Sequence, residues 1–425
     1  MNRKQSRAEG RRSNVFPPDL RSLPLPLRKK AAAARRLARE RGLPLYLVGG
    51  ALRDLMLRRP IADLDLAVEG DAVSFGQALG RRLGARARAH ERFGTAALEF
   101  EDGSRLDVAA SRAESYEAHG ALPRVAPAPI AADLARRDFT VNAMALEIGP
   151  GRRVRLHDPL GGARDLSRGV IRMLHAGSAM DDPTRAFRAA RYANRLGFRV
   201  ERRTRQWIGE ALRSGAFEAV SGDRLRREMR LLLSEEDPAG AVRRLCGLGL
   251  QEAVHRALPC GDSVLARLAR AERLARKGGT AADWLTCLLL WAGDLSARQT
   301  REIAVRLSLP REEARILTSW PSTWKALAAG HVPSGSRGSA LSQRESAAAR
   351  AMLPREAGGA KVARATAAAH LRLHVRGSDL VAAGMPAGPR IGRALDATLV
   401  ARREGRITSE QELAFALKAA RKEAS

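Results

Sequence analysis

Strand-forming patterns are confined to the first part of this 425-residue chain, and this distribution limits its possible folds more than any other feature. Leu45–Val48 is a short apolar run, and Leu64–Val68 is apolar except for Asp65; both are typical of buried strands. Thr95–Phe100 and Arg105–Ala109 flank an Asp-Gly pair and predict a hairpin. From about residue 180 onward such patterns nearly vanish. The sequence therefore predicts an α+β fold, with a small mixed-sheet head followed by a long helical body.

Helical patterns fill most of the remaining chain, which is rich in Ala, Leu and Arg. Two helices are expected beside the first strands, at about 27–41 and 71–83. Further helices are expected at 182–196, 202–213, 223–233 and 237–247, and they continue beyond. Residues 331–345 are rich in Gly and Ser and are the best candidate for a linker.

The N-terminal stretch does not read as a targeting or membrane segment. Residues 1–26 mix Arg, Lys, Ser and Pro and predict a disordered basic leader. Its charges lack the apolar core of a secretory signal, and no apolar run reaches the ~18 residues that a membrane span needs. We expect a soluble cytoplasmic protein without a membrane partner. No pattern sets its oligomeric state.

The charge balance is strongly basic, with 75 Lys and Arg against 46 Asp and Glu, a formal charge of +29. A field of this size attracts polyanions. GC-rich coding DNA would enrich Arg equally well, so charge alone makes a nucleic-acid partner plausible and no more. Aromatic residues are only 4% of the chain, which disfavours base stacking as the main binding mode.

The cysteines Cys246, Cys260 and Cys287 are widely spaced and show no paired ligand spacing. A disulfide or a zinc site is therefore not expected, in keeping with a reducing compartment.

Asp63 and Asp65 stand two residues apart at the start of the second strand. Because strand side chains alternate, both carboxylates point to one face. Two carboxylates held together are stabilised by a cation, and oxygen ligands suit Mg²⁺. Phosphoryl transfer uses this ion, often as a pair, to bind the triphosphate and activate the attacking hydroxyl. Isolated pairs of this kind are mostly solvated loop acids.

Two glycines strengthen the functional interpretation. Gly49 and Gly50 follow the first strand and precede a helix, so the backbone there can approach a nucleotide phosphate. Arg53, on the first turn, can reach the triphosphate, whereas Asp54 can simply brace the loop. Asp107, on the second hairpin strand, would join the pair as a third catalytic carboxylate if its strand is adjacent. A plain edge-strand acid is the alternative.

Five motifs follow one another in the order of a known family. They are GGALRD (49–54) with DLDLAV (63–68), RRDFTVNAMAL (136–146), DPLGGARDL (158–166), DDPTRAFRAARYANRLGF (181–198) and DRLRREM (223–229). This set resembles the class II tRNA nucleotidyltransferases and bacterial poly(A) polymerases of the polymerase-β superfamily. The resemblance covers about 45–250 and returns at 377–395.

The resemblance implies a nucleotidyltransferase head at 27–172, a helical neck with a base-reading helix at 173–250, and an RNA-binding body and tail at 251–425. It implies Mg²⁺, CTP, ATP and tRNA as cofactor, substrates and partner. Asp63 and Asp65 would hold the metal ions. The positions that would contact the nucleotide or order the head are Gly50, Arg53, Arg136 and Arg137.

The resemblance further implies that Asp182 and Arg185 read the incoming base, with Arg188 and Arg191 as phosphate or RNA contacts. Cytosine and adenine both show an amino donor beside a ring-nitrogen acceptor, which a carboxylate and a guanidinium can pair. Uracil and guanine reverse this order, leaving buried groups unpaired at ~1–3 kcal/mol each. The family usually has Glu where this chain has Asp181. A solvated basic helix is the plain alternative.

Three functions remain open at this point. The first is addition of C, A or both to tRNA, favoured by residues 115–125 and 377–395, which look like tRNA-type members. The second is a poly(A) polymerase, and the third an RNA-binding protein on an inactive scaffold. Arg137 paired with Asp138 or another neighbour is a structural alternative for the RRD segment.

Overall fold

The computed structural model describes residues 18–115, 124–149, 154–329, 343–352, 372–403 and 406–422. The chain divides into two compact units. The first comprises residues 1–221 together with Gly247–Leu250, and the second comprises Gly222–Cys246 and Gln251–Ser425. The chain therefore leaves the first unit, returns to it for four residues, and leaves again.

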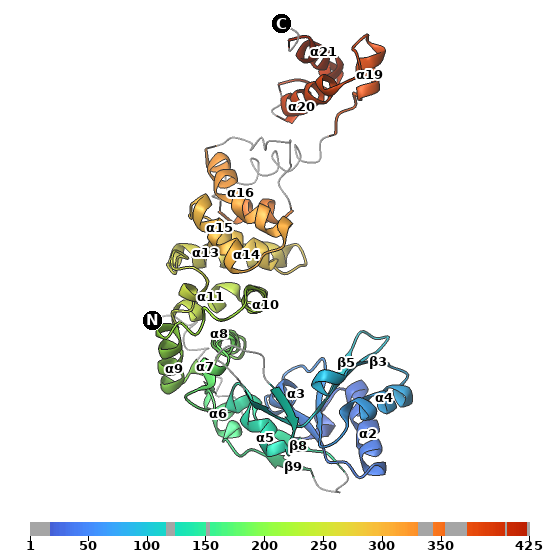
Figure 1. Cartoon of the computed structure of the whole chain (residues 1–425), viewed down its shortest axis with the longest axis vertical. Coiled ribbons are helices and arrows are strands. Elements are labelled where there is room, and N and C mark those ends of the chain that lie inside the picture. Colours follow the sequence, from blue (N-terminus) through green and yellow to red (C-terminus); the bar gives the residue numbers. More distant parts are fainter. Residues whose placement is uncertain are drawn as a thin grey trace. The chain divides into compact units, whose positions relative to one another are not determined.

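A seven-stranded mixed sheet forms the centre of the described part of the first unit (Figure 1). The only parallel neighbours in it are β2 and β5, and all other described pairs are antiparallel. In sheet order the strands are β3 (Arg86–His90), β4 (Thr95–Glu99), β5 (Arg105–Ala110), β2 (Leu64–Val68), β1 (Leu45–Val48), β8 (Ala145–Glu147) and β9 (Arg155–His157).

Helices cover both faces of this sheet, and the alternation of side chains along β2 shows which face carries Asp65. The helix α4 (Ala72–Leu83) packs on β3, β4 and β5, and α2 (Leu25–Glu40) packs on α4. On the other face, α5 (Ile130–Ala135) forms an apolar cluster with Tyr46, Val48 and Ala67. Because Asp65 lies two residues before Ala67, its carboxylate lies on the α5 face.

The first unit also contains short helices and strands outside the sheet. A short helix, α3 (Gly49–Met56), follows β1 directly. Beyond the sheet, α8 (Thr184–Leu196) is the longest described helix of this part. The others are η1 (Leu20–Ser22), η2 (Glu91–Phe93), β6 (Arg112–Ser115), β7 (Arg124–Pro127), η3 (Thr140–Asn142), α6 (Gly162–Arg168), β10 (Val170–Ile171), α7 (Ser178–Asp181), β11 (Arg199–Val200) and α9 (Arg202–Arg213).

The described residues of the second unit form helices and no strand. A fully buried helix, α14 (Trp284–Trp291), packs against α10, α13, α16 and α17. The helices are α10 (Gly222–Leu233), α11 (Pro238–Cys246), α12 (Gln251–Val254), α13 (Asp262–Lys277), α14, α15 (Ala297–Arg306), α16 (Arg311–Ala328) and α17 (Gln343–Met352). The last group is α19 (Gly377–Ala382), α20 (Pro389–Arg403), η4 (Ser409–Gln411) and α21 (Glu412–Lys422), with its own apolar cluster.

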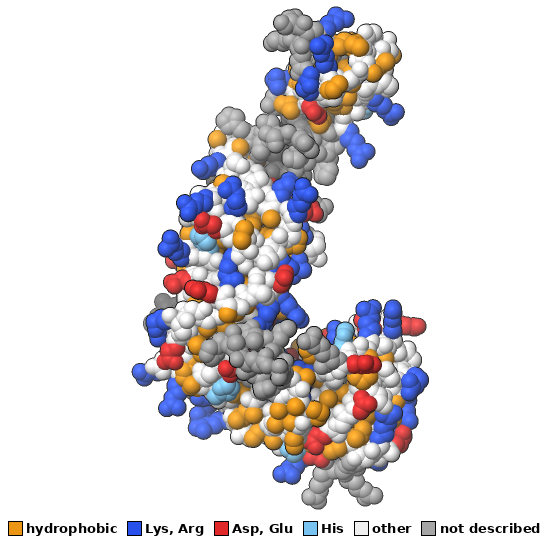
Figure 2. All heavy atoms as spheres, in the orientation of Figure 1, with side chains coloured by type: hydrophobic (Ala, Val, Ile, Leu, Met, Phe, Trp, Pro, Cys, Tyr) orange, Lys and Arg blue, Asp and Glu red, His pale blue; other side chains and the backbone are white. Residues whose placement is uncertain are grey.

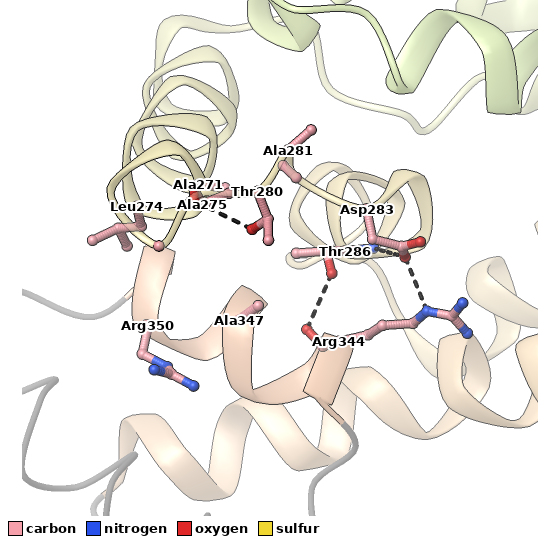
Figure 3. Close-up of a pocket in the computed structure, with 12 residues that line it drawn as sticks. Ala271, Leu274, Ala275, Thr280, Ala281, Asp283, Thr286, Arg344, Ala347 and Arg350 are labelled. Carbon is pink, nitrogen blue, oxygen red and sulfur yellow. Dashed lines mark hydrogen bonds and ion pairs between the residues drawn. The ribbon is translucent and has the colours of Figure 1, made fainter. Parts of the chain in front are cut away.

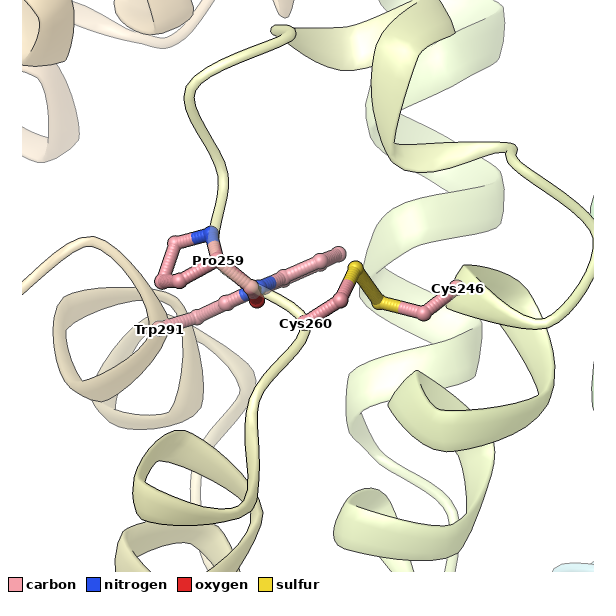
Figure 4. The surroundings of a disulfide bond; sticks show 4 residues. All are labelled: Cys246, Pro259, Cys260 and Trp291. Carbon is pink, nitrogen blue, oxygen red and sulfur yellow. Dashed lines mark hydrogen bonds between the residues drawn. A yellow bond between two sulfur atoms is a disulfide. The ribbon is translucent and has the colours of Figure 1, made fainter.

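A disulfide joins Cys246 to Cys260 (Figure 4), so the expectation of no disulfide was wrong. The bond connects the last residue of α11 to the segment before α13, where the Cα atoms are 5.8 Å apart, within the usual range. The indole of Trp291 donates to the carbonyl of Pro259 at 2.7 Å and holds that segment against α14. Spacing along the sequence could not show this proximity, because it results from tertiary folding.

The element predictions were otherwise confirmed closely. The first two strands have the predicted bounds, and the 95–110 hairpin forms. The α+β class, with helices dominating after residue 180, is confirmed; β11 is a two-residue exception. Residues 1–17, most of the 331–345 linker and residues 116–123 lie outside the described residues. In the described part of the chain, no helix combines the length and apolar character of a membrane span.

Candidate active site

Asp65 lies directly opposite Asp107 in the parallel register of β2 and β5. Asp63 precedes β2 by one residue and therefore shares the face of Asp65. Neighbouring strands are ~4.8 Å apart, so the three carboxylates lie within a small area of the sheet. The condition set for Asp107, that its strand be adjacent, is confirmed.

The surroundings of Asp65 disfavour its charge. Burial raises the pKa of Asp65, and the charges of Asp107 and Asp63 raise it further. The guanidinium of Arg137 and the backbone N–H of Ala51 act in the opposite direction without cancelling the effect. A positive ion at this position would relieve the repulsion among the three carboxylates.

Arg105 contacts the carboxylates of Asp63 and Asp107. Its backbone N–H donates to Asp63 Oδ1 at 2.9 Å, and its Nε donates to Asp107 Oδ1 at 2.7 Å. Within the described ranges, no three His, Cys, Asp or Glu side chains come together as a ready metal-binding group. The donor set nevertheless suits a hard cation, because it consists of carboxylate oxygens on one face.

Gly49 occupies the point where α3 begins beside these carboxylates. Its φ of +64° is left-handed, which favours glycine. A Cβ at this position would lie 3.1 Å from Arg137 Nη1 and 3.6 Å from Asp65 Oδ2. Gly50 follows, and a Cβ there would lie 3.6 Å from Arg53 Nη2. The backbone at the start of α3 is therefore closely surrounded by charged side chains.

Arg53 is buried, with 3% of its surface exposed, and it does not extend toward solvent. It donates to both oxygens of Asp54 at 3.0 and 2.8 Å and to Asn142 Oδ1 at 2.8 Å. Burial alone would lower the pKa of Arg53, but the hydrogen bond to Asp54 raises it above its usual value. These contacts fit a residue that orders the head.

A buried polar chain continues from Arg53 to α8. Asn142 donates to Asp138 Oδ1 at 3.0 Å, and Arg188 donates to Asp138 Oδ2 at 2.8 and 2.5 Å. Burial would raise the pKa of Asp138, but the Arg188 charge and the hydrogen bond from Asn142 lower it below its usual value. The sheet side and α8 are thus joined through ionised, hydrogen-bonded groups.

Asp133, which the sequence reading did not single out, pairs with both Arg136 and Arg137. The Nη2 atoms of the two arginines lie 2.5 and 2.9 Å from its two oxygens, and the carboxylate is 2% exposed. Arg137 therefore pairs with Asp133, whereas Asp138 pairs with Arg188. The signal was available, because an acid three and four residues before two arginines predicts such pairs when the acid is on a helix. Here Asp133 is on α5, and Arg136 and Arg137 follow directly after its last residue, Ala135.

The start of α8 places the proposed base-reading residues in defined orientations. Asp182 Oδ1 accepts from the backbone N–H of Thr184 at 3.0 Å and from its hydroxyl at 2.6 Å, as a helix cap does. Arg185 is 6% exposed, and its Nη2 donates to the carbonyl of Arg136 at 2.8 Å. Arg191 is equally buried, with its guanidinium over the ring of Tyr192. The predicted residues of the head and of α8 are thus brought together within the first unit.

A cavity of about 490 Å³ lies elsewhere, in the second unit between α13, α14 and α17 (Figure 3). Alanines provide much of its lining. Its charged groups include Asp283 and Arg344, which pair at 2.9 Å, and Thr286 donates to the backbone of Arg344 at 3.5 Å. The acid in this lining, Asp283, is paired with Arg344, so the aspartate cluster remains the candidate active site.

The chain matches a family model, and it is similar in sequence to known tRNA nucleotidyltransferases. A family model for the poly A polymerase head domain matches residues 45–172. The chain is 40% identical over 245 residues to an A-adding tRNA nucleotidyltransferase of Geobacter sulfurreducens, covering 58% of this chain and 28% of that protein. Two other A-adding relatives are likewise spanned over half or less of their length, at 50% and 23%.

A CC-adding tRNA nucleotidyltransferase of Deinococcus radiodurans matches over nearly the whole chain. The two are 31% identical over 382 residues, which is 88% of this chain and 89% of that one. Among solved structures, a CCA-adding enzyme in complex with CTP superposes with a TM-score of 0.75 at 27% identity, covering 94% of this chain and 97% of that chain.

Proposed function

The chain belongs to the class II tRNA nucleotidyltransferase family, as the match to the CC-adding relative over 89% of that protein shows. From this premise we propose that it adds CMP, AMP or both to the 3′ end of tRNA. CTP and ATP are the proposed donors, and pyrophosphate is the proposed product. Magnesium is the proposed cofactor. The observation that carries the proposal is the register of Asp65 with Asp107 beside the start of α3.

Asp63 and Asp65 are the residues that we propose to hold the metal, since both lie on the α5 face at the start of β2. When bound there, Mg²⁺ would offset part of the triphosphate charge and lower the pKa of the attacking 3′-hydroxyl. Asp107 is the proposed third catalytic carboxylate. The raised pKa of Asp65 supports this arrangement, because a cation would favour its ionised form.

The start of α3 supplies backbone donors for the phosphates. Gly49 and Gly50 carry no side chain that would block them, and helix N-termini favour anions. Arg136 and Arg137, fixed by Asp133, are proposed to orient the nucleotide or the head around it. Arg53 is proposed to order the start of α3, because its buried guanidinium contacts Asp54 and Asn142.

Asp182 and Arg185 are proposed to read the base. The cap contacts of Asp182 and the bond from Arg185 to the Arg136 carbonyl hold both groups in place before a nucleotide binds. A carboxylate and a guanidinium held in fixed positions can accept the amino group and donate to the ring nitrogen of cytosine or adenine. Arg188 and Arg191 are proposed to support the nucleotide or the RNA phosphates from the same helix.

The tRNA partner is consistent with the exposed charge of the second unit. Figure 2 shows basic side chains and little acidic surface on the visible face of α19–α21. The exposed residues there include Arg376, Arg390, Arg393, Lys418 and Arg421. We retain the division into head, neck, body and tail as a proposal. Because tRNA is the substrate, we also propose a cytoplasmic location, where disulfides are usually transient.

One assay tests the proposal. Purified protein is given tRNA that ends before CCA, tRNA that ends after CC, and an unrelated RNA, each with CTP, ATP or both. Addition of the missing nucleotides to tRNA alone supports the proposal. Repeated A addition to the unrelated RNA would instead indicate a poly(A) polymerase, and no extension of any RNA would indicate an inactive scaffold. Asp65→Asn serves as the inactive control.

A further inference from the structure

The ring of Tyr192, on α8, has three guanidinium groups over it. The Cζ atoms of Arg191, Arg53 and Arg188 lie 4.8, 5.2 and 5.7 Å from the ring centroid. The ring of Phe139 meets it edge-on at 5.9 Å. All three guanidinium distances are within the ~6 Å at which cations and aromatic faces attract.

These arginines come from two separate elements. Arg188 precedes Tyr192 by one helical turn and Arg191 by one residue, so both belong to α8. Arg53 belongs to α3, which begins beside Asp65. Tyr192 is therefore a side chain on which the carboxylate side of the site and the base-reading helix meet.

Three positive charges around one point repel each other, so something must offset their repulsion. Carboxylates do part of this, since Asp54 pairs with Arg53 and Asp138 with Arg188. The negative face of the ring attracts all three groups at once. The hydroxyl of Tyr192 makes no hydrogen bond to any described residue, so the ring rather than the hydroxyl provides the interaction.

We propose that Tyr192 is a positioning residue for the incoming nucleotide. This inference rests on the proposed function. The ring of Tyr192 keeps Arg53 of α3 and Arg188 of α8 at a fixed separation. A nucleotide with its phosphates at the start of α3 and its base at Asp182 and Arg185 must span this separation. Loss of the ring should therefore weaken nucleotide binding and base choice together.

The first test compares Tyr192→Phe with Tyr192→Leu. The Phe variant keeps the ring and should retain kcat and the nucleotide KM within about twofold. The Leu variant keeps apolar volume without a ring, and its KM for CTP or ATP should rise by about 3- to 30-fold, with weaker discrimination against UTP. Equal impairment of both variants, or unchanged KM and discrimination in the Leu variant, would overturn the proposal.

Phe187→Leu is the matched control on the same helix. The Phe187 ring is buried and packs against Phe217 at 6.0 Å, with no guanidinium over it among the described residues. Its loss should lower the melting temperature and leave nucleotide choice unchanged. If Phe187→Leu weakens discrimination as much as Tyr192→Leu, the effect is general packing and the proposal fails.

A second variant covers the case in which Tyr192→Leu does not fold. Replacement of Tyr192 by a trifluorinated phenylalanine keeps the shape of the ring but weakens its negative face. The nucleotide KM should then rise above that of Tyr192→Phe, and equality of the two would contradict the proposal. Calorimetric binding of CTP and ATP to each variant separates the outcomes. A wild type that binds nucleotide but extends no RNA refutes only the proposed function, and one that binds none refutes both.

Discussion

Asp65 on β2 and Asp107 on β5 are direct partners across parallel strands, so their carboxylates share one face of the sheet. Burial and the charge of Asp107 together raise the pKa of Asp65. In a protein without bound metal, the ionised carboxylate therefore destabilises the fold. The arrangement that we propose for catalysis is one that the fold alone does not favour.

Asp65→Asn should be more stable than the wild type at pH 7 to 8 in the presence of a chelator. A raised folded-state pKa means that the wild type is relatively more stable at low pH and loses this advantage as pH rises through the folded value. The difference should vanish toward the unfolded pKa of about 4. Thermal unfolding across pH measures it. Mg²⁺ should stabilise the wild type and not the variant, and a less stable variant at pH 8 contradicts the prediction.

Gly49→Ala should reduce kcat/KM by roughly 10²-fold, because the added methyl displaces Arg137 beside Asp65. Its control is Gly84→Ala, at the end of α4. Gly84 has a similar φ of +67°, but nothing lies within 4 Å of an added Cβ. Both variants should lose about 1–2 kcal/mol of stability from left-handed strain. Equal activity in the two variants would show that the Arg137 contact is unimportant.

Asp133→Asn should lower the free energy of unfolding by roughly 3 kcal/mol, because two arginines lose the charge of a buried partner. Asp223→Asn is the matched control. Asp223 pairs with Arg226 while its own side chain is 73% exposed, so its loss should cost about 0–1 kcal/mol. Urea titration measures both. A loss no larger than that of the control would indicate that Arg136 and Arg137 need no fixed partner.

Asp182→Asn should raise the use of UTP relative to CTP by about 10-fold. Asparagine can still cap α8 at Thr184, so the helix start is retained while the carboxylate that accepts the base amino group is lost. Single-nucleotide incorporation with each triphosphate measures the ratio. Asp181→Asn should leave it unchanged. An unaltered preference for C and A in Asp182→Asn would remove this residue from base reading.

Reduction of the Cys246–Cys260 disulfide should lower stability by about 3 kcal/mol, the effect expected for a closed loop of this length. Cys246→Ser and Cys260→Ser should each show the same loss and no further response to reductant. Burial raises the pKa of the Cys287 thiol, so that cysteine should remain unreactive. Thermal unfolding with and without reductant, together with thiol counting, tests this. A reductant effect that persists in Cys246→Ser would contradict it.

Local patterns predicted the elements well because their causes are local. Leu45–Val48 is apolar and is followed by glycine, and Leu64–Val68 is apolar except for Asp65 and is preceded by aspartate. Both strands have the predicted bounds. The common face of Asp63 and Asp65 followed from alternation along a strand. The position of Asp107 could be predicted only on the condition that β5 pairs with β2, which is a tertiary fact.

Contacts across long sequence distances were not predictable in this way. Asp138 and Arg188 are 50 residues apart, and nothing in the two motifs indicates that these side chains are in contact. The three guanidinium groups over Tyr192 come from two helices, and the sequence pattern does not predict that these helices lie close together. The disulfide was predicted wrongly for the same reason, since a separation of 14 residues says nothing about distance in space.

The return of Gly247–Leu250 to the first unit affects how this chain can be divided. Leu250 is fully buried, and Gly249 lies near Leu212 of α9. A fragment ending at residue 221 would omit these four residues and leave an apolar gap beside α9. An isolated first unit should therefore fold better when this tetrapeptide is restored to it, for instance through a short engineered connection, than when it is produced by a single cut after residue 221.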